Sequence, residues 1–293
     1  MGDASPSCAP LDHSLLEELM NRLRSGIHDQ ELGGAKELRR LAKLSSSNRI
    51  RISEAGAIPL LLKALKSSGT DVQAHSIAAL LNLTIRNDAN KQAILLAKGL
   101  DSIVDVLKKG KLQESRENAA ALLFNLSHAN SHRMTVASTE GIFTGLAELL
   151  RDGSARGKRD VAAALFNLLQ IRHCRPLAVR AGVVVPLLRL AQDSSLGLVD
   201  ESLTVLLNLA GHQEGRFAIM QASGIRTLVD LLRRGSDSNK EYACAVLLVL
   251  CLDDYACSEE ACNLGVQELL ENLLVSGTER AQRKAAKIME LLK

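Results

Sequence analysis

A short apolar motif that carries one asparagine recurs along the chain at nearly constant spacing. Its asparagines are Asn82, Asn125, Asn167 and Asn208, which lie 43, 42 and 41 residues apart. The next repeat keeps the apolar residues and has Cys251 in the asparagine position. A self-similar period of this length is typical of repeat proteins, in which each repeat is one supersecondary unit that stacks on its neighbours.

A second series of glycines has the same period. It consists of Gly56, Gly99, Gly141, Gly182, Gly224 and Gly265. A glycine at such a point supplies the left-handed backbone that ends one helix and turns the chain into the next. The pattern predicts a short helix before each glycine, a second helix after it, and a longer third helix that carries the asparagine. Units of roughly 40 to 47 residues are typical of the armadillo and HEAT class, and three helices favour armadillo.

We therefore predict an all-α fold, a right-handed armadillo-repeat superhelix (α-solenoid) of about seven three-helix repeats. Residues 1–13 are expected to be a disordered leader, with Ser14 as the N-cap of the first helix and Glu17 as its capping-box partner. The armadillo-repeat domain is expected to cover residues 14–293. Its predicted repeats are about 14–47 (partial, without the short helix), 48–89, 90–130, 131–172, 173–213, 214–256 and 257–293, the last of them more polar.

Composition argues against several classes of function. The net charge is only +3, so we expect no nucleic-acid partner, and no apolar run is long enough for membrane insertion. The six cysteines form no Cys-x-x-Cys pair, which favours reduced thiols in a cytoplasmic and/or nuclear protein. No catalytic or nucleotide-binding motif is present, so we expect no enzyme activity, cofactor, metal or small-molecule substrate, and a monomer.

The third helices of armadillo repeats line a concave groove, and residues spaced by four and seven share one side of a helix. The candidate groove residues form two rows, one at the asparagine position and one seven residues earlier: Arg40, Asn82, Asn125, Asn167 and Asn208, then His75, Asn118, Asp160 and Glu201. One carboxamide per repeat could hold the backbone of an extended peptide, since repeats about 9–10 Å apart match two to three residues at about 3.3 Å each. The alternative is that each asparagine bonds a neighbouring carbonyl and only shapes the solenoid.

Charge is unevenly distributed along this groove. Lys36 and Arg40 make its first end basic, whereas Asp160, Asp200 and Glu201 make its later middle acidic. A partner segment with acidic residues at one end and basic ones further along would complement it. The alternative is a solvated face whose charges are incidental. A separate basic series opens the short helices, and we expect it to satisfy the last carbonyls of the preceding third helices: Arg49, Lys91, Arg133, Arg175 and Arg216.

Several segments resemble the armadillo domain of plant U-box/armadillo proteins. They lie at residues 51–62, 116–127, 156–168, 179–186, 197–201 and 277–280, and the resemblance covers about residues 15–293. It implies recruitment of substrates or receptor-like kinases, while a separate U-box upstream docks a ubiquitin-conjugating enzyme. The sequence shows no U-box stretch.

We therefore expect a non-catalytic scaffold that binds a partner segment in its groove, within a ubiquitination or signalling pathway. The first alternative is an E3 ubiquitin-protein ligase of the U-box/armadillo family. The second alternative is an import-type cargo adaptor. In such adaptors a tryptophan stands four residues before each asparagine, and here those positions are Ala78, Ala121, Ala163 and Thr204.

Overall fold

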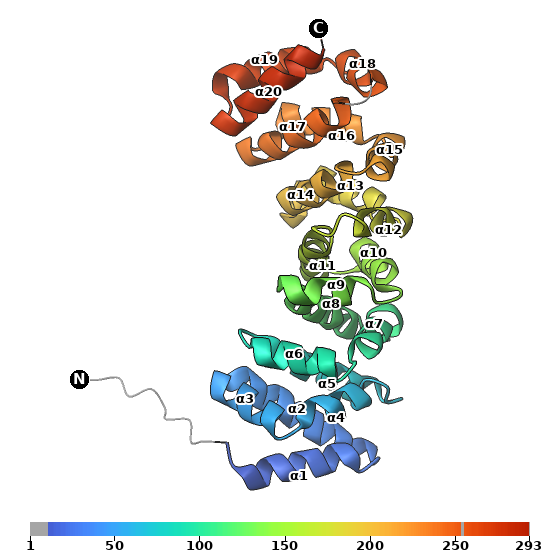
Figure 1. The fold of residues 1–293 in the computed structure, drawn as a ribbon, viewed down its shortest axis with the longest axis vertical. Coiled ribbons are helices and arrows are strands. Elements are labelled where there is room, and N and C mark those ends of the chain that lie inside the picture. Colours follow the sequence, from blue (N-terminus) through green and yellow to red (C-terminus); the bar gives the residue numbers. More distant parts are fainter. Residues whose placement is uncertain (1–10, 253–254, 293) are drawn as a thin grey trace, which may run out of the picture. The chain divides into compact units, whose positions relative to one another are not determined.

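The computed structural model describes residues 11–252 and 255–292. These residues form α-helices and one short 3-10 helix, with no strand among them (Figure 1). The chain divides into two compact units, Met1–Gly141 and Ile142–Lys293. Each unit is an α-solenoid segment, as the repeat pattern predicts.

The first unit opens with a pair of helices and continues with three-helix repeats. Its helices are α1 (His13–Arg24), α2 (His28–Leu44), α3 (Ser46–Glu54), α4 (Ala57–Ala64), α5 (Thr70–Thr84), α6 (Asp88–Leu96), α7 (Leu100–Lys109), α8 (Gln113–Ser127) and α9 (Asn130–Ala137). The third helices of successive repeats pack against one another, α2 on α5 and α5 on α8. Among the described residues, two helices, α1 and α2, precede α3.

The second unit continues the same alternation. Its helices are α10 (Ile142–Asp152), α11 (Ala155–Leu168), α12 (Cys174–Arg180), α13 (Val184–Gln192), η1 (Ser194–Leu196), α14 (Val199–Ala210), α15 (Gln213–Gln221), α16 (Gly224–Arg234), α17 (Asp237–Cys251), α18 (Tyr255–Asn263), α19 (Val266–Ser276) and α20 (Glu279–Leu291). Here α11, α14, α17 and α20 are the third helices, each packed on the next.

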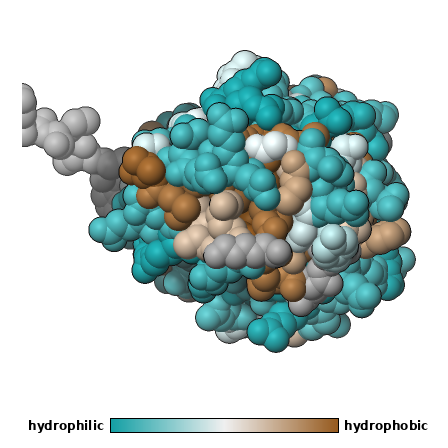
Figure 2. All heavy atoms as spheres, turned by 90° about the horizontal axis from the view of Figure 1, so that it is seen from above, coloured by the Kyte–Doolittle hydropathy of each residue, from teal (hydrophilic) through white to brown (hydrophobic). Residues whose placement is uncertain are grey.

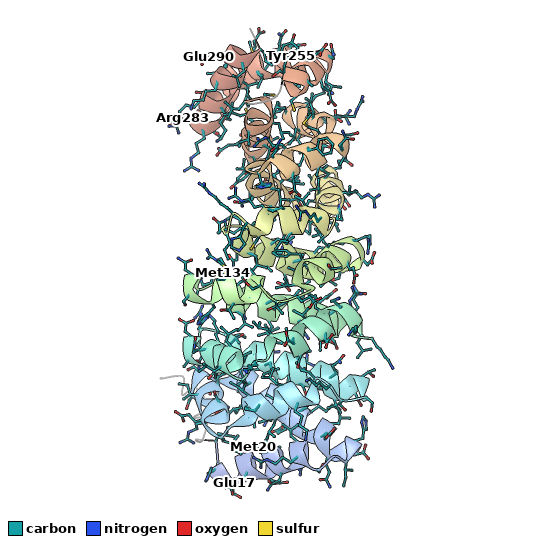
Figure 3. The ribbon with its side chains drawn as sticks, turned by 45° about the vertical axis from the view of Figure 1, so that its right-hand side comes forward. Glu17, Met20, Met134, Tyr255, Arg283 and Glu290 are labelled. Atoms are coloured by element: carbon teal, nitrogen blue, oxygen red, sulfur yellow. The ribbon has the colours of Figure 1, made fainter. Side chains whose placement is uncertain are left out.

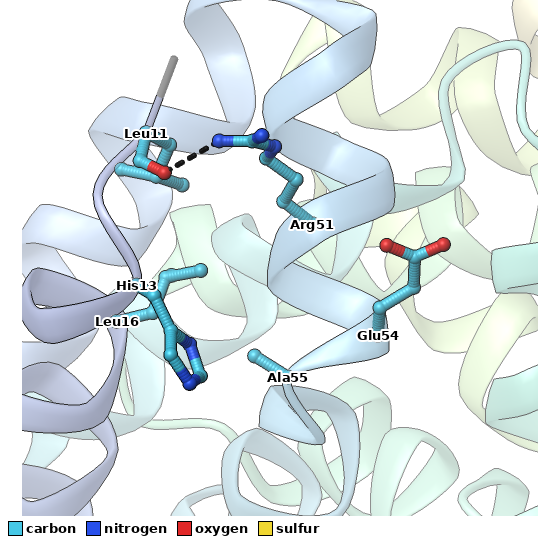
Figure 4. A pocket seen from close by; sticks show the side chains of 6 residues that line it. All are labelled: Leu11, His13, Leu16, Arg51, Glu54 and Ala55. Atoms are coloured by element: carbon cyan, nitrogen blue, oxygen red, sulfur yellow. Dashed lines mark hydrogen bonds between the residues drawn. The ribbon is translucent and has the colours of Figure 1, made fainter.

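The first helix begins earlier than the sequence suggested. Asp12, and not Ser14, is the N-cap, and its carboxylate accepts a hydrogen bond from the backbone N–H of Ser14. Leu11 is buried, and its carbonyl accepts from Arg51 Nη1 at 2.7 Å across a pocket between α1 and α3 (Figure 4). The predicted leader is therefore wrong for residues 11–13, because these contacts hold them on the domain. Residues 1–10 of that leader lie outside the described residues.

The glycine series performs two different structural roles. Four of its six members have the predicted left-handed backbone: Gly56, Gly141, Gly182 and Gly265. In the other two repeats the preceding residue takes that conformation, Lys98 at φ 52° and Ser223 at φ 58°. There the glycine permits a close approach, since a Cβ on Gly224 would lie 2.4 Å from Ile219 Cγ2.

Alanine and leucine fill the interior of both units. Ala79 and Ala164, on the third helices, are completely buried, which allows close approach of neighbouring helices as expected. The side chains of Cys174, Cys244, Cys251 and Cys257 are buried and that of Cys262 is partly so, while Cys8 lies outside the described residues. Burial raises the pKa of the Cys244 thiol to about 12. These buried thiols are therefore packing groups.

The last repeat has a mixed outer surface. Arg283 and Glu290 project from α20 into solvent, in keeping with the expected polar character (Figure 3). Yet Tyr255 and Val275 are 84% and 85% exposed. Seen from this end, the surface has a central group of hydrophobic residues surrounded by hydrophilic ones (Figure 2).

Candidate protein-binding face

The accessible side of the third helices, here called the third-helix face, is organised in the same way in both units. Charged side chains lie on the first turns, small residues such as the partly accessible Ala163 lie in the middle, and apolar side chains are exposed towards the ends. Exposed apolar residues at or next to the ends of these helices include Leu44 and Ile85 in the first unit, and Phe166, Leu252 and Leu291 in the second. A face with separate charged and apolar halves suits a protein surface better than a small solute.

In the first unit, the asparagines bond to the preceding repeat. Asn82 Nδ2 donates to the carbonyl of Arg39 at 3.1 Å, and Asn125 Nδ2 donates to Thr84 Oγ1 at 2.9 Å. Both side chains are half-buried. No donor among the described residues bonds either side-chain oxygen. The amide nitrogens therefore tie adjacent repeats together, while the oxygens remain as acceptors on the face.

The other predicted asparagines differ in position. Asn208, half-buried, donates to the carbonyl of Thr204 in its own helix at 3.2 Å. Asn118 and Asn167 are only 3% and 7% exposed. These two side chains are therefore buried and contribute almost no surface to the third-helix face.

A polar cluster connects the third helices of the first unit, α2, α5 and α8. Arg39 Nη1 lies 3.3 Å from His75 Nδ1, and Arg39 Nη2 donates to Glu114 Oε1 at 3.1 Å. Burial lowers the pKa of His75, and the positive charges of Arg39 and Lys36 lower it further. The adjacent residue Arg40 forms a bidentate pair with Glu37. Its Nε donates to Oε2 at 2.8 Å and its Nη2 donates to Oε1 at 2.6 Å. The predicted basic end is therefore partly neutralised by acidic partners.

Charges in the second unit are also paired, both within a third helix and between neighbouring ones. Asp160 lies 3.8 Å from Arg156, and Glu201 lies 3.8 Å from Arg159 on the preceding third helix. Asp200 accepts hydrogen bonds of 2.6 Å from Ser238 and from Asn239. The predicted acidic stretch is thus bonded to its neighbours, so it offers less free negative charge than the sequence suggests.

The exposed apolar residues of this face were missed in the sequence. Phe166 immediately precedes an asparagine of the recurring motif, and its side chain is 41% exposed. Its sequence signal is the bulk of Phe124 and Phe166 at a position where three other repeats have a leucine, namely Leu81, Leu207 and Leu250. Apolar residues at helical spacing ordinarily indicate core, which is why this signal was passed over.

The basic series at the short helices confirms the capping prediction in four of five repeats. Arg49, Arg133, Arg175 and Arg216 each donate to a carbonyl at the end of the preceding third helix, at 3.1 to 3.3 Å. Lys91 contradicts the prediction, since it bonds Asp88 at 2.8 Å. In that repeat the carbonyl of Leu83 is met by Asn90 Nδ2 at 2.9 Å instead.

Two other kinds of site find no support in the described chain. His132 is bonded to Gln92 at 2.7 Å, and no three metal-ligating side chains of the described residues come together. None of the helices over these residues combines the length and the apolar character that a bilayer-spanning helix needs.

The fold and this face define an armadillo-repeat protein, and the comparisons narrow the class. Residues 13–293 match the family model of the plant U-box protein ARM repeat region. The chain belongs to that family, and the resemblance noted in the sequence is confirmed.

Curated relatives carry the same family name. The chain is 44% identical to U-box domain-containing protein 12 of Oryza sativa subsp. japonica over 96% of its own length and 46% of the relative. It is 42% identical to U-box domain-containing protein 14 of Arabidopsis thaliana, over 99% of this chain and 45% of that one. The chain thus spans under half the length of these relatives.

Solved structures agree on the fold. An engineered protein aligns with a TM-score of 0.78 at 26% identity, covering 94% of this chain and 67% of that one. A designed armadillo repeat protein aligns with a TM-score of 0.51 at 20% identity, over 95% of this chain and 100% of its own. Armadillo repeats form a protein-binding solenoid, which is the coarse function of this chain.

Proposed function

We propose that the chain is a non-catalytic scaffold that binds a partner segment along the third-helix face and recruits it to a ubiquitination or signalling pathway. The observation that supports this most directly is the exposure of Phe166 near the end of α11, a third helix whose first turns carry charged side chains. Aromatic side chains at the centre of a surface contribute strongly to binding when a partner covers them.

The asparagines would contribute a second kind of contact. The side-chain oxygens of Asn82 and Asn125 can accept hydrogen bonds from the backbone of an extended peptide. Such contacts hold a backbone without reading its sequence, so the charged first turns would select the partner. Cationic side chains would have no aromatic ring to stack on at Ala78 or Ala121, which argues against an import-type cargo adaptor.

A photo-crosslinking experiment tests the face with a matched control. Phe166 and Phe217 are both exposed phenylalanines of the second unit, at 41% and 63%, but Phe217 lies on the short helix α15. Each is replaced in turn by benzoylphenylalanine, and the protein is irradiated in plant cell extract. We expect discrete protein adducts from position 166 and background from 217. Adducts from 217 alone, or none from 166, would overturn the proposal.

The alternative of an E3 ubiquitin ligase is supported only by the names of the relatives, of which this chain spans part. We propose that any ligase activity belongs to a U-box and that these repeats supply recruitment. An in vitro ubiquitination assay on this chain, with a full-length relative as positive control, should yield no conjugates. Ubiquitin chains formed by this chain would contradict the scaffold assignment.

A further inference from the structure

A small pocket lies between α10, α11 and α13 of the second unit, away from the third-helix face. Its volume is about 120 Å³. Leu150, Pro186 and Leu190 form its apolar floor, and all three are buried. The rim consists of Arg151, Lys158, Arg189, Asp193 and Leu196. The pocket therefore combines an apolar base with a charged opening.

The rim carries more positive than negative charge. Arg151 pairs with its neighbour Asp152 at 3.4 Å. Lys158 helps to lower the pKa of Asp193, after the hydrogen bonds that this carboxylate accepts from Ser195. Arg189 is exposed, and no carboxylate of the described chain lies within salt-bridge distance of it. Lys158 and Arg189 are therefore the two cations of the rim that can pair with a ligand.

The sequence around the pocket is also rich in basic residues. Residues 151–189 contain eight arginines and lysines against two acidic residues, whereas the whole chain has a net charge of +3. The remainder of the chain is thus slightly acidic, although Arg159 and Arg180 of this stretch pair with Glu201 and Glu214 outside it. A concentration of one sign attracts the opposite sign from solution.

The chain is also exceptional at this point. In the second unit the other connections from second to third helix are two residues, Gly153–Ser154, Gly235–Ser236 and Gly277–Thr278. Between α13 and α14 the chain instead forms η1 and a left-handed Gly197 (φ 61°). This insertion brings Leu196 to the pocket edge. The extra residues thus shape a wall that a regular repeat would lack.

We propose that this pocket binds a peptide in which one aliphatic side chain is flanked by carboxylates. The aliphatic group would rest on Leu150, Pro186 and Leu190, since a cavity of about 150 Å³ holds a molecule of benzene's size. The flanking carboxylates would pair with Lys158 and Arg189. This site is distinct from the third-helix face and gives the second unit a further point of partner selection.

A neighbouring pocket provides an internal comparison. It lies on the other side of the α13–α14 connection, has a volume of about 320 Å³, and its lining includes Asp230 and Arg234. The opposite charges of these two residues leave that pocket without an excess of either sign. Arg234→Gln therefore removes a cation from the same edge of the unit without touching the proposed site.

The test uses a labelled eight-residue peptide of glutamates and aspartates with one central leucine, and fluorescence anisotropy at low salt. We expect Lys158→Gln and Arg189→Gln each to weaken binding about threefold and together about tenfold, the size of partly exposed ion pairs. Arg234→Gln should leave the affinity unchanged. A peptide with serine in place of the leucine, and one with lysines in place of the acidic residues, should bind at least tenfold more weakly.

Each alternative result is informative. Equal binding by wild type and the double variant would overturn the site, and so would an equal loss with Arg234→Gln. Equal binding of the serine peptide would overturn the apolar contact. A peptide with phosphoserines in place of the acidic residues is also measured. If it binds far more tightly and depends on the same two cations, the group recognised is a phosphate and not a carboxylate. The proposed function rests on the third-helix face and is tested separately by the photo-crosslinker at position 166. A negative result in the peptide-binding test therefore overturns only the pocket.

Discussion

Arg39 on α2 donates a hydrogen bond of 3.1 Å to Glu114 on α8, and the pair reaches across α5, which lies between them in the repeat order. The guanidinium also contacts His75 on α5, so one side chain connects the third helices of three successive repeats. Because a repeat usually contacts only its neighbours, this connection couples repeats that would otherwise be independent.

The first prediction concerns that ion pair. In a double-mutant cycle with Arg39→Gln and Glu114→Gln, the coupling energy should be about 0.2–1 kcal/mol at low salt, because both side chains are partly exposed. Urea denaturation of the four proteins measures it. The coupling should shrink in 1 M salt, and a coupling that is unaffected by salt would contradict an electrostatic origin.

The second prediction is a pH dependence from His75. Its folded-state pKa lies below the ordinary value, mainly through burial and then through Arg39. The unfolded state therefore binds the proton more readily, so this residue's contribution to stability is complete above about pH 6.5 and is lost as the pH falls below that value. Denaturation curves at pH 7.5 and 5.5 should show a smaller loss of stability for His75→Gln than for wild type. An identical loss would remove His75 as the cause.

The third prediction tests the close packing of third helices. Ala164 is completely buried, whereas its neighbour Ala163 is partly accessible on the same helix. Ala164→Leu should lower the free energy of unfolding by about 1–3 kcal/mol through overpacking. Ala163→Leu, the matched control, should change it by less than about 0.5 kcal/mol. Equal thermal melts for the two variants would show that the helix is rotated from the described register.

The fourth prediction separates two roles of the turn between α15 and α16. Ser223→Gly should raise the free energy of unfolding by about 0.5–1 kcal/mol, because it removes the strain of a left-handed serine. Gly224→Ala should lower it by about 1–3 kcal/mol, since a Cβ would meet Ile219. Thermal melts of both variants measure this, and a destabilising Ser223→Gly would contradict the backbone argument.

The sequence predicted the fold well because the period is a strong signal. The recurrence of the asparagine and of the glycine fixes helix number, order and approximate length in each repeat. It also predicted the arginine caps, since a basic residue directly after a helix has few other partners than the last carbonyls. The prediction was wrong for Lys91, because its ammonium group donates to the carboxylate of the nearby Asp88 and not to a helix-end carbonyl.

The candidate site was less predictable, because periodicity places a residue on a helix but leaves its partners undetermined. Asn125 and Asn167 occupy equivalent positions in the repeat, yet Asn125 is half-buried and bonded to Thr84, while Asn167 is 7% exposed. Exposure depends on how side chains from neighbouring repeats pack around each position, which the repeat period does not encode.

The recurring asparagine motif thus determined by itself that the chain is an α-solenoid of three-helix repeats, because a fixed period of helices can bury its apolar faces only by stacking. The tertiary structure alone decided which side chains remain accessible. It exposed Phe166, paired Arg39 with Glu114, and shaped the pocket beside Lys158 and Arg189. Those outcomes arise from contacts between residues that are distant in sequence, where the repeat pattern carries no information.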